Sequence, residues 1–582
     1  MPSPTNHSTT GKISLKVTNT LVALAFVVLC GVLVFNYLKG PEGAAPTSPG
    51  AALPASSKTG EKVLNITFYS SSAKKNWVDK MVEEFNASGA SVGGKVIRVQ
   101  QYHVNSGESL DDLKAGKIQP DLWSPGDESW LELAAAHWKN VKQRTLFDDY
   151  VPLVNIPLVI AMWEPMARAL GHPGPIGWKD VAKVAADPRG WEAFGHSEWG
   201  KFRWGHAHPD ANSGFLTIVS EVYAALGKTE GMTVEDLKNP QVMAFLKEFE
   251  GAVEHYGLSN SWIDDLMHAK GPAYLSAAVQ YENTIIEANE KYGNKPFKLV
   301  AVYPTEGAFW TRHPVALLKE AWMTGEKEEA CKEFVDFLLG EKAQQQAMAM
   351  GLRPIARNMQ LSSPFDVDHG VDTRIASDKV FQVPDETVLK RIRDLWEEVK
   401  IPATIVLILD RSGSMKGEPM DNAKEGAVHF IRSMKPRDNL EVVVFNNQVT
   451  VLSPLCPVKQ CGEDAVTRLE GVFAEGGTAL YDAIAQVYAG LRAEERRHPN
   501  RRYGIVVLSD GKDTGSAVNR HDFMDSLPKG EDFDVPKIYT IAYGPEADRN
   551  LLAEISNRTN ARLFSSSAEK IATTYRELSA NF

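Results

Sequence analysis

The chain has 582 residues, more than a single hydrophobic core normally holds, so several folded units are expected. Hydrophobic residues make up 43% and charged residues 24% of the sequence. These values are ordinary for folded protein and predict that disorder is confined to short segments. The formal net charge of -11 argues against a nucleic-acid ligand, because binding to a phosphate backbone normally requires a basic surface.

An apolar stretch without charged side chains lies near the N-terminus. As a helix, residues 17–38 would be about long enough to cross a hydrocarbon core of roughly 30 Å. Lys12 and Lys16 precede the stretch, so the positive-inside rule places the tail 1–16 in the cytoplasm. We therefore expect a single-pass anchor in the cell membrane, with the rest of the chain in the periplasm or at the cell exterior. A cleaved signal peptide is the alternative, although the apolar core of such a peptide usually has only about 7 to 15 residues.

Composition and alternation divide the rest of the chain. Residues 39–61 are rich in Pro, Ala, Gly and Ser, which is typical of a flexible linker that cannot bury enough apolar surface to fold. Strand-like and helix-like segments alternate over 62–382, which predicts an α/β domain with a largely parallel sheet. Apolar residues at helical spacing predict a connecting helix within 383–401. The apolar run that follows it begins a second α/β domain, 402–582.

Two of the four cysteines lie close together. Cys456 and Cys461 are five positions apart in a predicted loop, whereas Cys30 lies in the apolar stretch and Cys331 in a predicted helix. An oxidising exterior would permit a disulfide between the loop cysteines, and two free thiols are the alternative. A zinc site is not expected, because no second pair of cysteines or histidines with ligand spacing accompanies them.

Hydroxyl and carboxylate side chains follow the strands predicted for the second domain. Asp410, Ser412 and Ser414 come directly after the buried run TIVLILD. Thr478 begins a predicted helix, and Asp510 follows the strand YGIVVLS. Ligands of open α/β sheets bind at the carboxyl ends of the strands, so we expect these residues to meet at one edge. Hard oxygen ligands of this kind suit Mg²⁺.

The pattern resembles the von Willebrand factor A (VWA) family, whose metal-ion-dependent adhesion site combines a DxSxS loop with a distant threonine and a distant aspartate. The resemblance implies a doubly wound, Rossmann-like fold and a bound Mg²⁺ or Mn²⁺. It also implies a protein partner that donates a carboxylate to the metal. The implied ligands are Asp410, Ser412, Ser414, Thr478 and Asp510. Catalysis is not expected, because phosphatases with an aspartate after a central strand use a second aspartate two positions later, and that position is Ser412.

Residues 62–382 are similar to the extracytoplasmic solute-binding proteins of bacterial ABC importers, in the two-lobed class that includes molybdate, sulfate and iron binders. The segments that carry the similarity include TFYSSSAKKNWVDKMVEEFN, VNIPLVIAMW, HAHPDANSGF and VQYENTIIE. The resemblance implies two lobes with a ligand cleft between them. It also implies that the chain crosses between the lobes twice, near 153–160 and near 301–312.

Polar residues before predicted helices are the candidates for this cleft, because free backbone N–H groups at helix N-termini bind anions. Ordinary helix capping would explain the same serines, aspartate and asparagine, and core packing would explain the tyrosine. The candidate ligand residues are Ser70, Ser71, Ser72, Ser124, Asp127, Asn212, Ser213 and Tyr281.

Together these features predict a membrane-anchored extracytoplasmic binding protein that is not an enzyme. One module would bind a small solute, and the other would bind a protein through a metal ion. One alternative is the substrate-binding component of an ABC importer, with the C-terminal module serving only to assemble or localise it. Another is a structural adhesin whose cleft binds nothing.

Overall fold

The computed structural model describes residues 62–579, apart from 258–259, 294–296, 357–358, 376–378, 511, 531, 533, 545 and 568–570. The predicted cytoplasmic tail, the membrane span 17–38 and all but the end of the linker therefore lie outside the described residues. Within the described part, no helix is both long and apolar enough to span a membrane.

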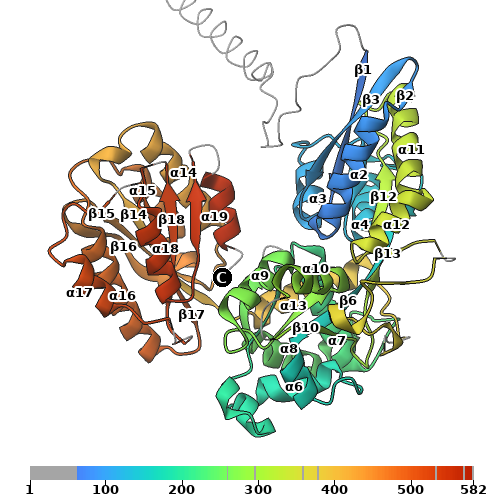
Figure 1. The fold of residues 1–582 in the computed structure, drawn as a ribbon. Coiled ribbons are helices and arrows are strands. Elements are labelled where there is room, and N and C mark those ends of the chain that lie inside the picture. Colours follow the sequence, from blue (N-terminus) through green and yellow to red (C-terminus); the bar gives the residue numbers. More distant parts are fainter. Residues whose placement is uncertain are drawn as a thin grey trace, which may run out of the picture. The chain divides into compact units, whose positions relative to one another are not determined.

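The first lobe of the first domain is built on a six-stranded sheet with the order β2-β3-β1-β4-β12-β5 (Figure 1). Its strands are β1 (Val63–Ser70), β2 (Ser91–Val92), β3 (Lys95–His103), β4 (Leu122–Ser124), β5 (Tyr150–Pro152) and β12 (Pro314–Leu317). Its helices are α2 (Lys75–Ser88), α3 (Ser106–Lys114), α4 (Glu128–His137), α11 (Gly325–Leu339) and α12 (Glu341–Ala349). A short 3-10 helix, Ser72–Lys74, leads into α2.

The second lobe has a sheet with the order β10-β6-β9-β7-β8, to which two short strands are added along β6. Its strands are β6 (Val154–Trp163), β7 (Trp204–Ala207), β8 (Val253–Gly257), β9 (Ala277–Tyr281), β10 (Leu299–Val302), β11 (Trp310–Thr311) and β13 (Arg353–Pro354). Its helices are α5 (Glu164–Ala169), α6 (Trp178–Ala186), α7 (Asn212–Leu226), α8 (Pro240–Gly251), α9 (Asn260–Lys270) and α10 (Glu282–Tyr292).

Both sheets of this domain are mixed, so the prediction of a largely parallel sheet is wrong here. β1 is parallel to β3 and β4, and β7 is parallel to β8 and β9. However, β12 is antiparallel to β4 and β5, and β6 is antiparallel to β9 and β10. The chain reaches β6 and β12 by crossing directly from the other lobe rather than through a βαβ unit. A direct crossing does not impose the parallel direction that a crossover helix imposes.

The chain crosses between the lobes three times, once more than predicted. The first crossing is at Leu153, between β5 and β6, and the second lies between β11 and β12. The third follows α12, because Arg353 and Pro354 in β13 pair with Asn155 and Val154 in β6. A two-residue strand carries no periodicity that a sequence could reveal.

The connecting helix α13 (Glu386–Val399) belongs to the core of the first domain. Asp385 caps its N-terminus by accepting a hydrogen bond from the Val388 N–H. The buried face of α13 packs against α7 and α8. There the indole Nε1 of Trp396 donates to Glu250 Oε2 at 3.0 Å. The helix α13 is therefore part of the hydrophobic core of the second lobe and also links the two domains.

The second domain has a six-stranded sheet with the order β16-β15-β14-β17-β18-β19, in which only β15 and β16 are antiparallel. Its strands are β14 (Ala403–Asp410), β15 (Asn439–Phe445), β16 (Val449–Pro457), β17 (Arg502–Ser509), β18 (Lys537–Tyr543) and β19 (Leu563–Ser566). Helices α14 (Glu418–Ser433), α15 (Val458–Glu470) and α19 (Ile571–Ser579) cover one face, and α16 (Leu480–Arg497), α17 (Arg520–Ser526) and α18 (Arg549–Arg558) cover the other. This is the doubly wound arrangement that was predicted, and it buries every residue of β14.

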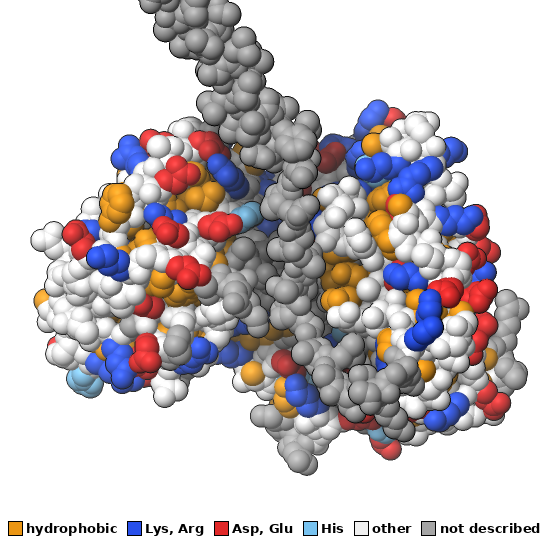
Figure 2. Space-filling model, turned by 90° about the horizontal axis from the view of Figure 1, so that it is seen from above, with side chains coloured by type: hydrophobic (Ala, Val, Ile, Leu, Met, Phe, Trp, Pro, Cys, Tyr) orange, Lys and Arg blue, Asp and Glu red, His pale blue; other side chains and the backbone are white. Residues whose placement is uncertain are grey.

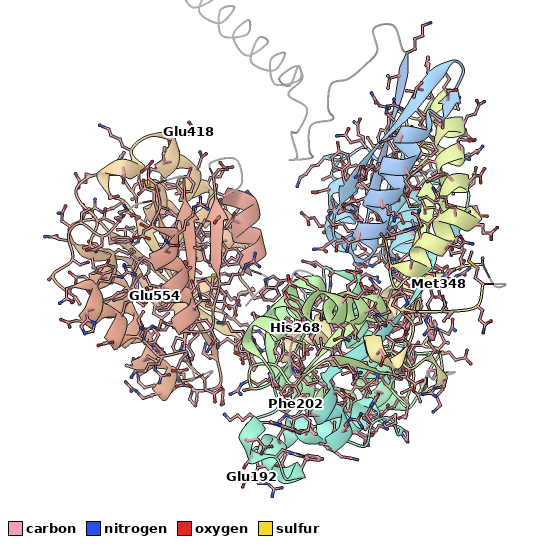
Figure 3. The ribbon with its side chains drawn as sticks, in the orientation of Figure 1. Glu192, Phe202, His268, Met348, Glu418 and Glu554 are labelled. Carbon is pink, nitrogen blue, oxygen red and sulfur yellow. A yellow bond between two sulfur atoms is a disulfide. The ribbon has the colours of Figure 1, made fainter. Side chains whose placement is uncertain are left out.

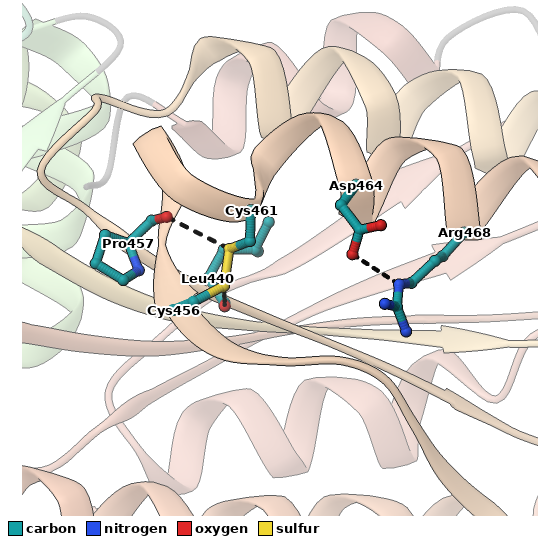
Figure 4. The surroundings of a disulfide bond; sticks show 6 residues. All are labelled: Leu440, Cys456, Pro457, Cys461, Asp464 and Arg468. Carbon is teal, nitrogen blue, oxygen red and sulfur yellow. Dashed lines mark hydrogen bonds and ion pairs between the residues drawn. A yellow bond between two sulfur atoms is a disulfide. The ribbon is translucent and has the colours of Figure 1, made fainter.

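Cys456 and Cys461 are joined by a disulfide at a strand-to-helix corner (Figure 4). Cys456 lies in β16, and Cys461 lies in the first turn of α15. The predicted loop at this position is therefore wrong. Pro457 is the last residue of the strand and stands at the N-cap position of the helix.

The charged side chains of the described surface are mixed in sign on the face that Figure 2 shows. Lys and Arg side chains lie among Asp and Glu side chains there, over both domains. On that face no large field of one sign attracts a highly charged polymer.

Candidate metal centre and solute cleft

The carboxylate of Asp410 belongs to the last residue of the central strand β14. It is fully buried and is held by two hydrogen bonds. The Ser412 N–H donates to Oδ1 at 2.8 Å, and the Ser509 hydroxyl donates to Oδ2 at 2.7 Å. Burial disfavours the charged form and raises the pKa of Asp410 to about 6. Each carboxylate oxygen has two lone pairs, so both retain the capacity to accept a cation.

Two hydroxyl groups connect Asp410 to the second carboxylate. The Ser412 and Ser414 hydroxyl oxygens lie 3.0 Å apart, and the Ser414 hydroxyl donates to Asp510 Oδ1 at 2.9 Å. Asp510 directly follows β17, the neighbour of β14 in the sheet. Burial raises its pKa as well. Adjacent parallel strands thus deliver both carboxylates to one edge.

Thr478 lies on a loop that is attached to the DxSxS loop. The Gly413 N–H donates to the Gly476 carbonyl at 2.9 Å. Gly476 has a φ of +83°, and a Cβ there would lie 2.4 Å from Asn447 Oδ1, so only glycine fits. Thr478 itself is 5% exposed, and its N–H donates to Thr514 Oγ1 at 3.0 Å. The threonine is therefore held in place through its backbone.

These residues fit a hard divalent cation. Four of the five predicted ligands form one hydrogen-bonded group, and the loop that carries the fifth is bonded to it. The donor set is two carboxylates and three hydroxyls, which is the oxygen-rich set that Mg²⁺ prefers. Among the described residues, no group of three or more His, Cys, Asp and Glu side chains is placed to hold a metal ion. Glu418, labelled in Figure 3, begins α14 just after the DxSxS loop.

Sequence reasoning missed Ser509 as part of this group. Its hydroxyl donates to Asp410 and so fixes the carboxylate that ends the neighbouring strand. The signal was a serine at the last position of β17, directly before Asp510. With a metal bound, such a residue would orient Asp410 and would not itself be a ligand.

A small cavity of about 30 Å³, partly open to solvent, lies in the cleft of the first domain. Five of the eight predicted residues line it: Ser71, Ser72, Asn212, Ser213 and Tyr281. It is also lined by Ala73, Asn105, Ser106, Gly126, Ala211, Asn260 and Thr284. Asn105 and Asn260 were missed, although each stands at a helix start, which was the signal used for the others.

Three predicted cleft residues are not among those that line the cavity. The Ser124 hydroxyl donates to the Pro314 carbonyl at 2.7 Å, and the Ser70 hydroxyl donates to the Ser71 carbonyl at 3.2 Å. Asp127 caps α4 by accepting from the Ser129 N–H at 3.0 Å. All three side chains are buried, and each has a backbone hydrogen-bond partner.

The lining residues are tied together by hydrogen bonds. The Trp130 indole donates to Asn212 Oδ1, and Asn212 Nδ2 donates to the Tyr281 hydroxyl, each at 2.6 Å. Asn212 and Ser213 were predicted to precede a helix, but they lie within the first turn of α7. The Ser213 hydroxyl donates to Asn260 Oδ1 at 2.8 Å. The cavity wall is therefore largely pre-organised.

Comparison with known proteins bears out both resemblances. Residues 66–353 match the family model of the bacterial extracellular solute-binding proteins, and residues 404–577 match the model of the von Willebrand factor type A domain. The chain joins a solute-binding domain to a VWA domain. The candidate metal centre lies in the VWA domain, and the cavity lies in the solute-binding domain.

Relatives of known sequence are similar to part of the chain. An uncharacterised protein of Synechocystis is 26% identical over 161 residues, which cover 27% of this chain and 36% of that protein. The human inter-alpha-trypsin inhibitor heavy chain H4 is 27% identical over 132 residues, which cover 22% of this chain and 14% of that protein. The chain therefore spans well under half the length of these relatives. Among solved structures, the ferric binding protein from Campylobacter jejuni is 14% identical with a TM-score of 0.40 and covers 57% of this chain and 99% of its own.

Proposed function

We propose that the chain is an extracytoplasmic binding protein, anchored by residues 17–38, with two ligands. The solute-binding domain takes a small solute into the cleft. The VWA domain binds a protein partner through Mg²⁺ or Mn²⁺. The observation that carries the metal-dependent part is the hydrogen-bonded group of Asp410, Ser412, Ser414 and Asp510, with the Thr478 loop attached to it.

Each residue of the metal centre would have a defined part. Asp410 and Asp510 supply negative charge, and the three hydroxyls supply neutral oxygen. Because only two of the five ligands are charged, a bound divalent cation would remain electrophilic and could accept a carboxylate oxygen from a partner. Ser509 and the Gly413–Gly476 backbone bond hold the loops in place so that little reorganisation accompanies binding.

A binding role is favoured over a catalytic one. Both oxygens of Asp410 accept hydrogen bonds, as does Oδ1 of Asp510. These hydrogen bonds oppose the effect of burial, which raises the pKa of Asp410 to about 6, so at neutral pH the carboxylate is still mostly ionised and available as a metal ligand. The cleft likewise offers hydroxyls and amides, which recognise a ligand by hydrogen bonds.

A peptide selection tests the partner class. A random peptide library would be selected on the immobilised full-length chain in MgCl₂, with elution by EDTA. We expect enrichment of peptides that contain Asp or Glu, and replacement of that residue by Asn or Gln should abolish binding. The Ser414→Ala variant should capture fewer of these peptides. Equal capture of the same peptides in EDTA would reject a metal-dependent partner.

A further inference from the structure

The cavity of the solute-binding domain is lined by hydrogen-bonding groups and by the starts of helices. None of the described residues that line it is acidic or basic. Ser106, Asn212 and Asn260 are the first residues of α3, α7 and α9. Ser72 begins the 3-10 helix before α2, and Tyr281 precedes α10. Helix N-termini carry free N–H groups and a partial positive charge.

An unpartnered donor in the cavity wall is a separate observation that points to a ligand. Asn260 is 6% exposed and lines the cavity. Its Oδ1 accepts from the Ser213 hydroxyl, but its Nδ2 has no hydrogen-bond partner among the described residues. A buried donor without a partner is costly, so an acceptor atom of a ligand is the natural partner for this amide.

Lys74 places a positive charge behind the same wall. Its side chain is buried, at 1% exposure, and within the described residues it forms no ion pair with a carboxylate. Its Nζ donates to the Ser71 hydroxyl oxygen at 3.0 Å and to the Ser124 carbonyl at 3.1 Å. Burial lowers the pKa of Lys74 to about 7. An anion in the cavity would stabilise the charged form of this amine.

Ser71 connects Lys74 to the cavity. Because its oxygen accepts from Lys74, its own O–H remains to be donated, and Ser71 lines the cavity. The other polar neighbour of this hydroxyl is His313 Nδ1, at 3.4 Å. A hydroxyl that accepts from a cationic amine is a stronger donor, so Ser71 can transmit the charge of Lys74 to a ligand.

We propose that the solute is a small oxyanion, bound by the neutral donors of the cleft and charge-compensated by Lys74 through Ser71. This proposal rests on the proposed solute-binding function. A cationic solute would face helix N-termini and the buried amine without a carboxylate in the wall. Two acids are buried near this wall: Asp127, which caps α4, and Asp264, which lies beside Thr284. Burial raises the pKa of both and so favours their neutral forms.

The test is a titration of the full-length chain with sodium sulfate, sodium phosphate and sodium molybdate, at ionic strength matched with sodium chloride. Isothermal titration calorimetry would measure the dissociation constants. Glucose, thiamine chloride and ferric citrate serve as neutral, organic-cation and metal probes. We expect saturable binding of at least one oxyanion. Lys74→Met should weaken it by about tenfold or more, since hydrogen bonds of charged groups are the strong ones. Lys80→Met, at an exposed position of the following helix α2, should leave it unchanged.

A second variant covers the case in which Lys74→Met fails to fold. Ser71→Ala removes the connecting hydroxyl, leaves the amine in place and should weaken oxyanion binding by a similar factor. An unchanged dissociation constant in a folded Lys74→Met or Ser71→Ala protein would overturn the proposed role of Lys74. Binding of glucose or a cation without binding of any oxyanion would overturn the ligand class and leave solute binding intact. If no probe of any class binds, the proposed function of the cleft fails as well.

Discussion

Replacing Asp410 by Asn should remove the metal response of the VWA domain while preserving its fold. The side chain is fully buried and provides one of the two carboxylates of the centre. Asn keeps the shape, accepts the Ser412 N–H through its amide oxygen and can pair its NH₂ group with Ser509. The substitution therefore removes half of the negative charge with little change in packing.

The expected size of the response follows from mass action. At free Mg²⁺ about 100 times its dissociation constant, binding to the folded state alone stabilises a domain by about 2.7 kcal/mol. For a domain of 150–250 residues, about 1 kcal/mol shifts the melting temperature by roughly 2–4 °C. The VWA match covers residues 404–577, so saturating Mg²⁺ should raise the melting temperature of this domain by roughly 5–11 °C.

Differential scanning calorimetry of the full-length chain, in EDTA and in MgCl₂, measures this shift. All 13 tryptophans precede residue 397, so a transition without a change in tryptophan emission belongs to the VWA domain. The control is Glu418→Gln, an exposed acid at the start of α14, which should keep the full shift. An equal shift in Asp410→Asn and in the unsubstituted chain would refute the assignment of the metal centre.

Three further predictions concern the rest of the chain. Labelling of unfolded, unreduced protein with a thiol reagent should modify the other two cysteines and leave Cys456 and Cys461 unmodified; equal labelling of all four would contradict the disulfide. Arg353→Met should lower the free energy of unfolding by about 3–5 kcal/mol in urea, because it leaves the fully buried carboxylate of Glu282 without its bidentate partner. A loss below about 1 kcal/mol would show that the pair is not needed. The protein should remain in the membrane fraction after carbonate washing, and recovery of a soluble form that lacks 17–38 would show cleavage instead.

The VWA domain was largely predictable because its signals are local. A fully buried strand reads as a continuous apolar run, and the residue that follows it must lie at the sheet edge. The positions of Asp410 and Asp510 thus follow from the strands alone. The contribution of Ser509 could not be predicted, because the sequence does not indicate which neighbouring strand the hydroxyl of a serine at a strand end will contact.

The cleft was less predictable because its residues come from segments that are distant in sequence. Ser71, Asn212 and Tyr281 could be chosen as helix-start residues, but capping and ligand binding use the same residue types. Asp127 illustrates the ambiguity, since it caps α4 and does not line the cavity. Lys74 gave no signal, because lysines in a predicted helix are usually exposed, and only the tertiary structure buries this one.

We propose that one chain holds two binding sites that act on different ligands. The most direct test is tryptophan emission of the full-length chain during a solute screen of anions, cations, sugars and peptides, performed once in EDTA and once in MgCl₂. Because every tryptophan precedes the VWA domain, emission reports the solute-binding domain. We expect a saturable emission change with the same midpoint under both conditions, together with the Mg²⁺-dependent melting shift of the VWA domain. A solute response that disappears in EDTA, or no response to any solute class, would contradict it.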